Sequence, residues 1–260
     1  MVLGPLLFCF VVSALKPLTT DAHLVKYVDD TTLCVPLYKN ESNDHVINEH
    51  LNVLKWSSEN GFKINLAKCK TICFTKMRNV TRAIKELDGV SEVDSLRFLG
   101  VTISDRLNLK SHIDNVCSLA SKRIYGLRVL KKMNLSHKSL CLVYNAVVRS
   151  LLEYASPSFG ELPSSLSGKL DKVQRRSHRL ICGLERGSLC DCGGFVSLSH
   201  RRKIATLKLF QKLADPDHIL HSILPGRSKH SSRFAQPPAS TTRFRSSFIP
   251  HATFISNSHI

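Results

Sequence analysis

Two β-prone runs on either side of a pair of adjacent carboxylates constrain this chain more than any other feature. The runs occupy residues 24–28 and 31–35, and Asp29 and Asp30 stand between them. Such runs around two turn-forming residues predict a β-hairpin with the carboxylates at its tip. Adjacent carboxylates repel unless a cation lies between them, and hard oxygen ligands suit Mg²⁺ or Mn²⁺. The alternative is a solvated turn, because short motifs also match by chance.

Charge narrows the class of partner. The 260 residues include 37 Lys and Arg against 20 Asp and Glu, which gives a formal net charge of +17. A strongly basic chain favours nucleic acid as partner, because Lys and Arg neutralise phosphates and release counterions. An ordinary basic surface is the alternative. The nine cysteines have no framework spacing and are odd in number, which favours a reducing, intracellular compartment.

The N-terminal apolar run, residues 6–15, could be mistaken for a signal peptide. It has no basic segment before it and is too short to span a bilayer, so we expect no membrane association. A buried helix that begins near Gly4 and Pro5 explains the same residues.

The first half of the chain alternates between helix and strand patterns. Residues 43–60 have an approximate 3.6-residue apolar stripe, which predicts a helix, and Gly61 follows as a left-handed terminator. Apolar residues at 62, 64 and 66 alternate with polar ones, which predicts a strand, and 71–74 predicts another. Residues 96–103 predict a pair of strands in which Gly100 allows close backbone approach.

From residue 112 onward the period becomes helical. Apolar residues at 113, 116, 120, 124, 127 and 130 form one face of a helix, and similar patterns predict helices over 136–154, 166–181 and 199–213. Pro157 should stop the second of these helices. Their polar faces are basic, and either bind nucleic acid or are merely solvated. The candidate binding residues are Lys122, Arg123, Arg175, Arg176, Arg179, Arg201, Arg202 and Lys203.

Two remaining segments are less informative. Residues 216–260 are rich in Ser, Arg, Pro and His without periodicity, so we expect a largely disordered basic tail. The cysteines and histidines between residues 178 and 200 do not have the spacing of a zinc site, because they do not form two matching pairs of ligands. Those candidates are Cys182, Cys190, Cys192, His178 and His200.

Four motifs in order resemble the reverse transcriptases of non-LTR retrotransposons, in particular the jockey-like LINE elements. They are VLGPLLF at 2–8, YVDDT at 27–31, GFKINLAKCKTICF at 61–74 and LRFLGVTISDRLNLKSHI at 96–113. Each motif is weak alone, but their order and spacing are specific. The resemblance covers residues 1–113 closely, and weaker similarity continues beyond them.

The resemblance implies an α+β fold: an incomplete right-hand polymerase palm with a motif-B helix, the Asp-Asp hairpin, a helix–strand unit and a grip-like hairpin. A thumb-like helical region and the disordered tail would follow. The implied domains are a partial palm at 1–105, a thumb or connection region at 106–215 and the tail at 216–260.

The resemblance also implies roles for particular residues. Asp29 would be the stronger Mg²⁺ or Mn²⁺ ligand and Asp30 the auxiliary one, both catalytic in two-metal nucleotidyl transfer. The partners would be an RNA template and a DNA primer, with deoxynucleoside triphosphates only in an intact polymerase. Lys68 and Lys70 would lie near the pyrophosphate. The residues near template or primer would be Gly4, Pro5, Tyr27, Leu99 and Gly100.

The family also uses an aspartate from a strand before the Gly-Pro motif, and a finger region that holds the nucleotide. Neither is present in these 260 residues, and Asp21, the only acid before Asp29, lies on the wrong side of the motif. We therefore expect an RNA-directed DNA polymerase portion that is inactive alone. A non-catalytic nucleic-acid-binding remnant is the first alternative. A small secreted or membrane-associated protein is the second.

Overall fold

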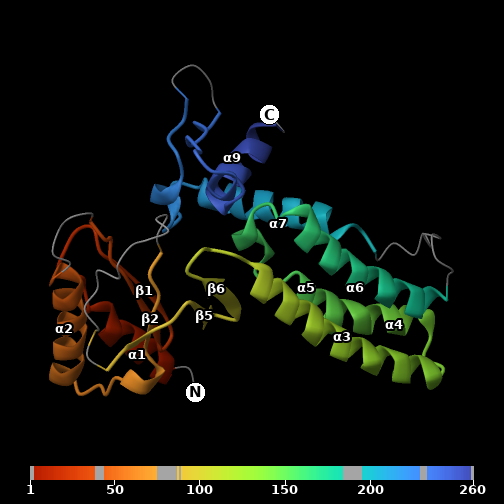
Figure 1. The fold of residues 1–260 in the computed structure, drawn as a ribbon, viewed down its shortest axis with the longest axis horizontal. Helices are drawn as coiled ribbons and strands as arrows, with labels where there is room; N and C mark the ends of the chain where they lie inside the picture. Colours follow the sequence, from red (N-terminus) through yellow and green to blue (C-terminus); the bar gives the residue numbers. More distant parts are fainter. Residues whose placement is uncertain are drawn as a thin grey trace. The chain divides into compact units, whose positions relative to one another are not determined.

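The computed structural model describes residues 3–38, 44–74, 87, 89–183, 195–228 and 233–258. The chain divides into two compact units, whose residues can be located by the sequence colours of Figure 1. Unit 1 comprises Met1–Leu96 and Ser104–Leu107, and unit 2 comprises Arg97–Ile103 and Asn108–Ile260. Helices and small two-stranded sheets make the chain α+β, as the sequence predicts.

Unit 1 is built around the hairpin that carries Asp29 and Asp30. Its strands β1 (His23–Tyr27) and β2 (Asp30–Cys34) are antiparallel, with Lys26 opposite Thr31 and Tyr27 opposite Asp30. We call this pair of strands the aspartate hairpin. The other elements are α1 (Leu3–Ser13), α2 (Asp44–Glu59), the 3₁₀ turn η1 (Leu66–Lys68), and the short parallel strands β3 (Lys70–Thr71) and β4 (Ser91–Glu92).

Aromatic packing joins the two helices of unit 1. The Phe62 ring stacks on Trp56 of α2 with ring centroids 5.6 Å apart, and Phe8 of α1 meets Phe62 edge-on at 5.7 Å. Gly61 follows the C-terminus of α2 and has a φ of +73°, the left-handed conformation expected of a glycine that terminates a helix. Phe62, directly after this glycine, therefore contacts both α2 and α1.

Three details of unit 1 differ from the sequence predictions. First, α1 is not a buried helix: of its residues only Val12 is buried, and Leu3, Leu6 and Phe10 are exposed. Second, α2 is rotated from its apolar stripe, so that Glu49 is buried and Leu51 is exposed, because Glu49 accepts hydrogen bonds from the backbone amides of Leu18 and Thr19. Third, residues 62–65 form no strand, because they lack a ladder partner, and the predicted strand 71–74 is reduced to Thr71 within β3.

Unit 2 begins with a second hairpin, β5 (Ser95–Phe98) and β6 (Val101–Ser104), whose first two residues and last residue belong to unit 1. We call it the glycine hairpin after Gly100 in its turn. Helices follow where the sequence predicts them. They are α3 (Lys110–Lys132), α4 (His137–Val143), the π-helical turn η2 (Tyr144–Arg149), α5 (Ser150–Leu152), η3 (Ser156–Phe159), α6 (Ser164–Cys182) and α7 (Leu198–Leu213).

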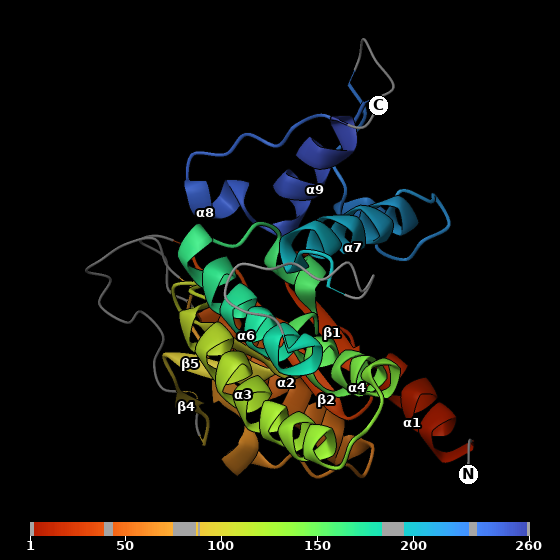
Figure 2. The same cartoon turned by 90° about the vertical axis from the view of Figure 1, so that its right-hand side faces the viewer.

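The core of unit 2 is continuous. The expected apolar face of α3 is confirmed, with Ile113, Ala120, Ile124 and Leu127 each at most 1 % exposed. This face packs on α6, and Figures 1 and 2 both show the two helices side by side. Tyr144 and Val148 complete the same core from the π-helical turn.

The C-terminal segment is not wholly disordered. Helices α8 (Thr242–Arg245) and α9 (Phe248–Asn257) follow η4 (His221–Ile223), and Ala252 and Ile255 of α9 are buried, with α9 packed on α7 (Figure 2). The Asn257 amide exchanges two hydrogen bonds with the backbone of Phe234. The prediction of disorder is therefore wrong for α8 and α9. The apolar face of α9 is too short to produce a recognisable periodicity in a segment rich in polar residues. Within the described residues, no helix has the length and apolarity needed to cross a membrane.

Candidate functional site

The aspartate hairpin turns through two residues, Val28 and Asp29. Because Tyr27 pairs with Asp30, the turn is as tight as a hairpin permits. Val28 has a φ of +55°, a region that β-branched residues rarely adopt. Backbone strain of this kind persists only where surrounding structure enforces it. The backbone immediately before the two carboxylates therefore has a strained, defined conformation.

Polar contacts hold the base of this hairpin. The buried Glu49 carboxylate accepts hydrogen bonds from the amides of Leu18 and Thr19 at 2.7–3.0 Å, in the segment that leads into β1. Burial alone would raise the pKa of Glu49, but these hydrogen bonds outweigh it and lower the pKa below its usual value. Glu49 is therefore a charged clamp between α2 and the start of the hairpin.

Lys26 makes a second clamp from within β1. Its Nζ donates to the carbonyls of Val12 and Leu15, at 2.7 and 2.6 Å, where α1 ends. Burial, and then the nearby Lys16, lower the pKa of Lys26. Cations stabilise helix C-termini, so Lys26 ties β1 to α1. Neither clamp was predicted from the sequence; Glu49 falls outside the apolar stripe of α2, and only its spacing of three from Val46 hints at burial.

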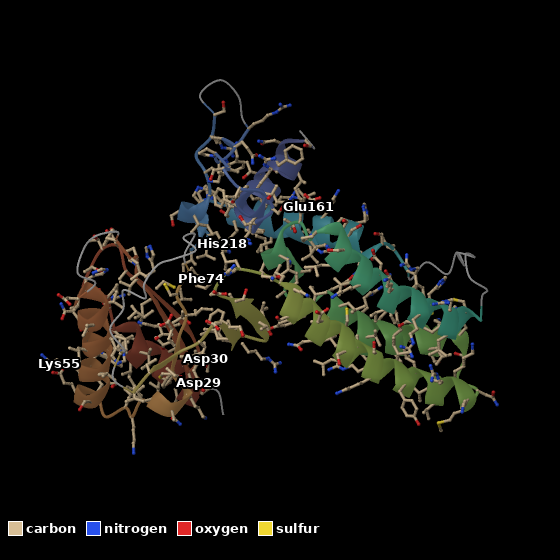
Figure 3. The ribbon with its side chains drawn as sticks, in the orientation of Figure 1. Asp29, Asp30, Lys55, Phe74, Glu161 and His218 are labelled. Carbon is tan, nitrogen blue, oxygen red and sulfur yellow. The ribbon has the colours of Figure 1, made fainter. Side chains whose placement is uncertain are left out.

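The tip of the hairpin is open. Asp29 and Asp30 are both exposed, and neither carboxylate has a hydrogen bond or ion pair to any described residue. Figure 3 labels the two residues next to each other. Within the part of the chain that the structure describes, no cluster of three or more His, Cys, Asp or Glu side chains is arranged to hold a metal ion.

The remaining acid near the hairpin is at its other end. Asp21 precedes β1 and accepts a hydrogen bond from the Tyr38 hydroxyl at 2.8 Å. The five-residue strand between Asp21 and the tip is on the order of 15 Å long. Asp21 therefore does not complete a ligand set with Asp29 and Asp30. The donor set at the tip fits one hard cation held by two carboxylates, and does not fit a pair of bridged ions.

Tyr27 pairs with Asp30 at the tip, whereas four other predicted residues of unit 1 have no contact with the tip among the described interactions. Lys68 is exposed at the end of η1, and the Lys70 Nζ donates to Ser91 Oγ at 2.7 Å. Gly4 and Pro5 lie exposed in the first turn of α1. No hydrogen bond or ion pair among the described residues links any of them to Asp29 or Asp30. A surface depression on α2, lined in part by Lys55, also excludes both aspartates, and Figure 3 shows Lys55 on the far side of this unit.

The predicted basic residues of unit 2 fall into two groups. Some are already engaged: Arg201 makes a two-pronged ion pair with Glu153, Arg123 donates to the Val147 carbonyl at 2.7 Å, and Arg202 is buried. Burial lowers the pKa of Arg202, while the hydrogen bonds that Arg201 donates to the Glu153 carboxylate raise the pKa of Arg201. Arg202 is therefore not on an exposed basic face, and Arg201 is paired with Glu153, which periodicity does not reveal because the partner lies in another segment.

The second group is free. Lys122 on α3 and Lys203 on α7 are exposed, and so are three of the predicted arginines of α6. With Lys172, these arginines follow one another at intervals of three, one and three residues, so they lie on one helical face opposite the buried residues. None of the four has an ion pair to a described residue. We call this face the basic stripe: Lys172, Arg175, Arg176 and Arg179.

The cysteine and histidine candidates for zinc form a different arrangement. His137, not a predicted ligand, lies between two thiols, with Nε2 3.4 Å from Cys182 Sγ and Nδ1 3.9 Å from Cys141 Sγ. The two nitrogens of the His137 ring point in different directions, each toward a different sulfur, so the ring and both thiols cannot bind the same metal ion. His178 packs against Phe195, and His200 is exposed on α7. Cys190 and Cys192 lie outside the described residues.

Comparison with known proteins supports the polymerase resemblance in the first part of the chain. Residues 1–103 match the family model "Reverse transcriptase (RNA-dependent DNA polymerase)". The match includes the aspartate hairpin, α2 and the glycine hairpin up to Ile103. The resemblance predicted from the motifs is therefore confirmed for this segment at the level of the reverse transcriptase domain. No curated protein matches the chain.

Proposed function

We propose that this chain supplies the Asp-Asp part of the palm, and a thumb, to the reverse transcriptase of a non-LTR retrotransposon. One observation carries the proposal: within the segment that matches the reverse transcriptase family, two adjacent carboxylates stand exposed at the tip of a clamped hairpin. Exposed, unpaired carboxylates on a rigid support are available to a cation. A merely structural turn has no need of the two clamps, Glu49 and Lys26, at its base.

Asp29 is the stronger ligand in this proposal and Asp30 the auxiliary one. A bound Mg²⁺ or Mn²⁺ would stabilise the charge that develops as a primer hydroxyl attacks a nucleoside triphosphate. Asp29 directly follows the strained Val28, so its orientation is fixed by the turn, whereas Asp30 belongs to β2. The carboxylates hold the ion, and the clamps keep their separation from α1 and α2 constant.

Lys68 and Lys70 act on the triphosphate side in this proposal. An ammonium group near the leaving pyrophosphate offsets its charge or protonates it. Gly4, Pro5 and Tyr27 lie near the template or the nascent base pair, and Leu99 and Gly100 lie near the primer end. These assignments rest on the family resemblance, and the exposure of Lys68 and Tyr27 supports their availability.

The basic stripe on α6 contacts the nucleic-acid backbone. Residues 172 and 179 are seven positions apart, so the stripe extends about 10 Å along the helix. Phosphates along one strand are separated by a few ångströms, so this length suits two or three successive phosphates. Lys122 and Lys203 are further candidates. Binding should depend steeply on salt and little on sequence.

Residues 1–260 alone should not synthesise DNA. The described residues bring no third acid to Asp29 and Asp30, and loss of one group that stabilises a transition state costs roughly 10²–10³ in rate. The assay is extension of a DNA primer on an RNA template with Mg²⁺ or Mn²⁺. Robust extension that disappears in Asp29→Ala would overturn this part of the proposal and make Asp21 the first candidate for the missing ligand.

The metal role is tested without activity. In a titration with Mn²⁺, the paramagnetic ion should broaden the NMR amide signals of residues 27–31 first, because the ion sits at the hairpin tip. Asp29→Asn with Asp30→Asn should abolish this selectivity, while Asp94→Asn, an exposed acid elsewhere in unit 1, should preserve it. Equal broadening in the wild type and the double variant would contradict metal binding at the tip.

A non-catalytic nucleic-acid-binding role is the second candidate function. The absence of a third acid at the tip, among the described residues, together with the unpaired basic stripe favours it. Under this alternative, primer–template binding persists while Mn²⁺ has no preferred position. The two titrations therefore separate the candidates.

A further inference from the structure

The turn of the glycine hairpin requires a left-handed backbone conformation at two successive residues. Its two central residues, Leu99 and Gly100, have φ values of +43° and +83°. Two successive positive φ values are the requirement of a type I′ turn, in which the first residue is commonly Asn, Asp or Gly. A leucine in this conformation requires support from the surrounding structure.

Tyr154, in the turn two residues after α5, supplies that support. Its hydroxyl donates to the Leu99 carbonyl at 2.7 Å. Its ring also lies against Gly100, where an added Cβ would be 3.0 Å from Cε1 and 3.5 Å from Cζ. One side chain therefore holds both residues of the turn, one by a hydrogen bond and the other by close packing.

A second contact attaches the same hairpin two residues further on. The Thr102 amide donates to Nδ1 of His112 at 3.3 Å, and the buried His112 ring packs on Phe159 with centroids 5.1 Å apart. Tyr154, His112 and Phe159 all belong to unit 2, and Arg97–Ile103 belongs to the same unit. The turn is thus fastened to the helices at two points.

We propose that Tyr154 is a positioning residue that fixes the Leu99–Gly100 turn to the helical unit, and so sets the position of the primer 3′ end. This inference rests on the proposed function, which places that turn beside the primer. Its consequence is that the turn moves with the thumb-like helices. A displacement of those helices then carries the primer-contacting backbone with it.

The matched variants are Tyr154→Phe and Tyr125→Phe. Both remove one hydroxyl from an exposed tyrosine of unit 2, but Tyr125 lies on α3 and has no hydrogen bond to a described residue. Loss of one such hydrogen bond should raise amide exchange over residues 97–103 about fivefold in Tyr154→Phe. Exchange in α3 and α6 should stay constant. Tyr125→Phe should leave the hairpin unchanged.

The functional readout is a photo-crosslink from a 4-thiothymidine at the primer 3′ end of an RNA–DNA hybrid. In the wild type, the peptide that contains residues 95–104 should carry the crosslink. In Tyr154→Phe the yield at this peptide should fall severalfold, while total binding of the hybrid stays the same. A purely structural effect on unit 2 would instead lower binding and all crosslinks together.

The outcomes separate this inference from the proposed function. If the hybrid binds but the wild-type hairpin never crosslinks, the proposed role of the turn is wrong. If the wild-type hairpin crosslinks and Tyr154→Phe changes neither crosslink nor exchange, the turn contacts the primer but Tyr154 does not position it.

Gly100→Ala provides a second test. The added methyl group should loosen the hairpin in the wild type, since it meets both the Tyr154 ring and an unfavourable φ. In a Tyr154→Ala background the steric part disappears, so Gly100→Ala should increase exchange less there. An equal increase in both backgrounds would remove Tyr154 from contact with the turn.

Discussion

The two units of this protein are stabilised in different ways. In unit 2, apolar side chains from α3, α4, η2 and α6 form one continuous buried core, with Ala120, Tyr144 and Val148 fully enclosed. In unit 1, few apolar residues are buried, and large ones such as Leu3 and Phe10 are exposed. Polar clamps from Glu49 and Lys26 hold its elements, together with the aromatic contacts of Phe62 with Phe8 and Trp56.

The difference shows what each unit contributes under the proposed function. Hydrophobic burial is proportional to area and tolerates small displacements, so unit 2 can present a long basic stripe on a stable scaffold. Hydrogen bonds to a buried carboxylate are directional, so unit 1 can hold two acidic residues at a defined position with little core. The predictions below test this contrast by hydrogen exchange, unit by unit.

The largest effect should come from the core of unit 2. Leu127→Ala removes a side chain that is 1 % exposed and should lower the stability of this unit by about 2–5 kcal/mol. Leu119→Ala, on the exposed side of the same helix, is the control and should change stability by less than about 1 kcal/mol. Protection in unit 1 should not change. An equal loss of protection in both units would show that they unfold together.

Glu49→Gln should have the next largest effect, and in unit 1. The variant replaces the carboxylate that accepts hydrogen bonds from the Leu18 and Thr19 amides with a neutral amide group, which cannot accept all of them. The free energy of unfolding should fall by roughly 1.5–3 kcal/mol. Glu59→Gln on the exposed end of the same helix should cost less than about 1 kcal/mol. If the two variants are equally stable, the clamp has no role in holding the hairpin.

Acid should weaken unit 2 before unit 1. Burial lowers the pKa of His112, His178 and His251 below the ordinary 6.5, and Arg97 lowers that of His112 further. The folded state then binds fewer protons than the unfolded one, so the stability of unit 2 is complete above pH 6.5 and falls as pH drops through the lower folded values.

The stability of unit 1 should depend on pH only in a more acidic range. The pKa of Glu49 lies below its ordinary 4.5, so its contribution persists above that pH and is lost only below it. Hydrogen exchange between pH 7 and 5, corrected for its intrinsic pH dependence, should show declining protection in unit 2 alone. Parallel decline in unit 1 would contradict the assignment of its stability to Glu49.

The smallest effect is expected at Val28. Val28→Gly relieves the strain of φ +55° but adds chain entropy to the unfolded state, for a net gain of about 0.5–1 kcal/mol. Val25→Gly, at an exposed strand position of the same hairpin, should destabilise it. A loss of stability in both variants would mean that the Val28 side chain contributes more by packing than it costs in strain.

The sequence predicted the elements whose pattern is local. The aspartate hairpin, the left-handed Gly61, the strand pair around Gly100 and the helices from α3 to α7 follow from periodicity and turn chemistry. The predicted strand at residues 62–65 failed because alternation alone does not supply a partner strand. The exposed face of α1 and the packed α9 were also missed, since burial depends on elements far away in sequence.

The candidate site shows the same limit. Adjacent carboxylates identify Asp29 and Asp30 without a structure, and helical spacing identifies Arg175, Arg176 and Arg179. Periodicity cannot show that Arg201 is paired with Glu153 or that Arg202 is buried. Nor can it reveal that Tyr154 meets a turn 55 residues earlier.

The central claim is that unit 1 carries the metal ligands and unit 2 carries the affinity for nucleic acid. It is tested most directly by titration of an RNA–DNA hybrid against three proteins over a range of salt concentrations: the wild type, Asp29→Asn with Asp30→Asn, and Arg175→Gln with Arg176→Gln and Arg179→Gln. Removal of three phosphate contacts should reduce the slope of log K against log salt by about two to three and weaken binding at low salt by at least tenfold. The aspartate variant should bind as well as the wild type or more tightly, because it loses negative charge. Unchanged affinity and slope in the arginine variant, or a loss of binding confined to the aspartate variant, would contradict the account.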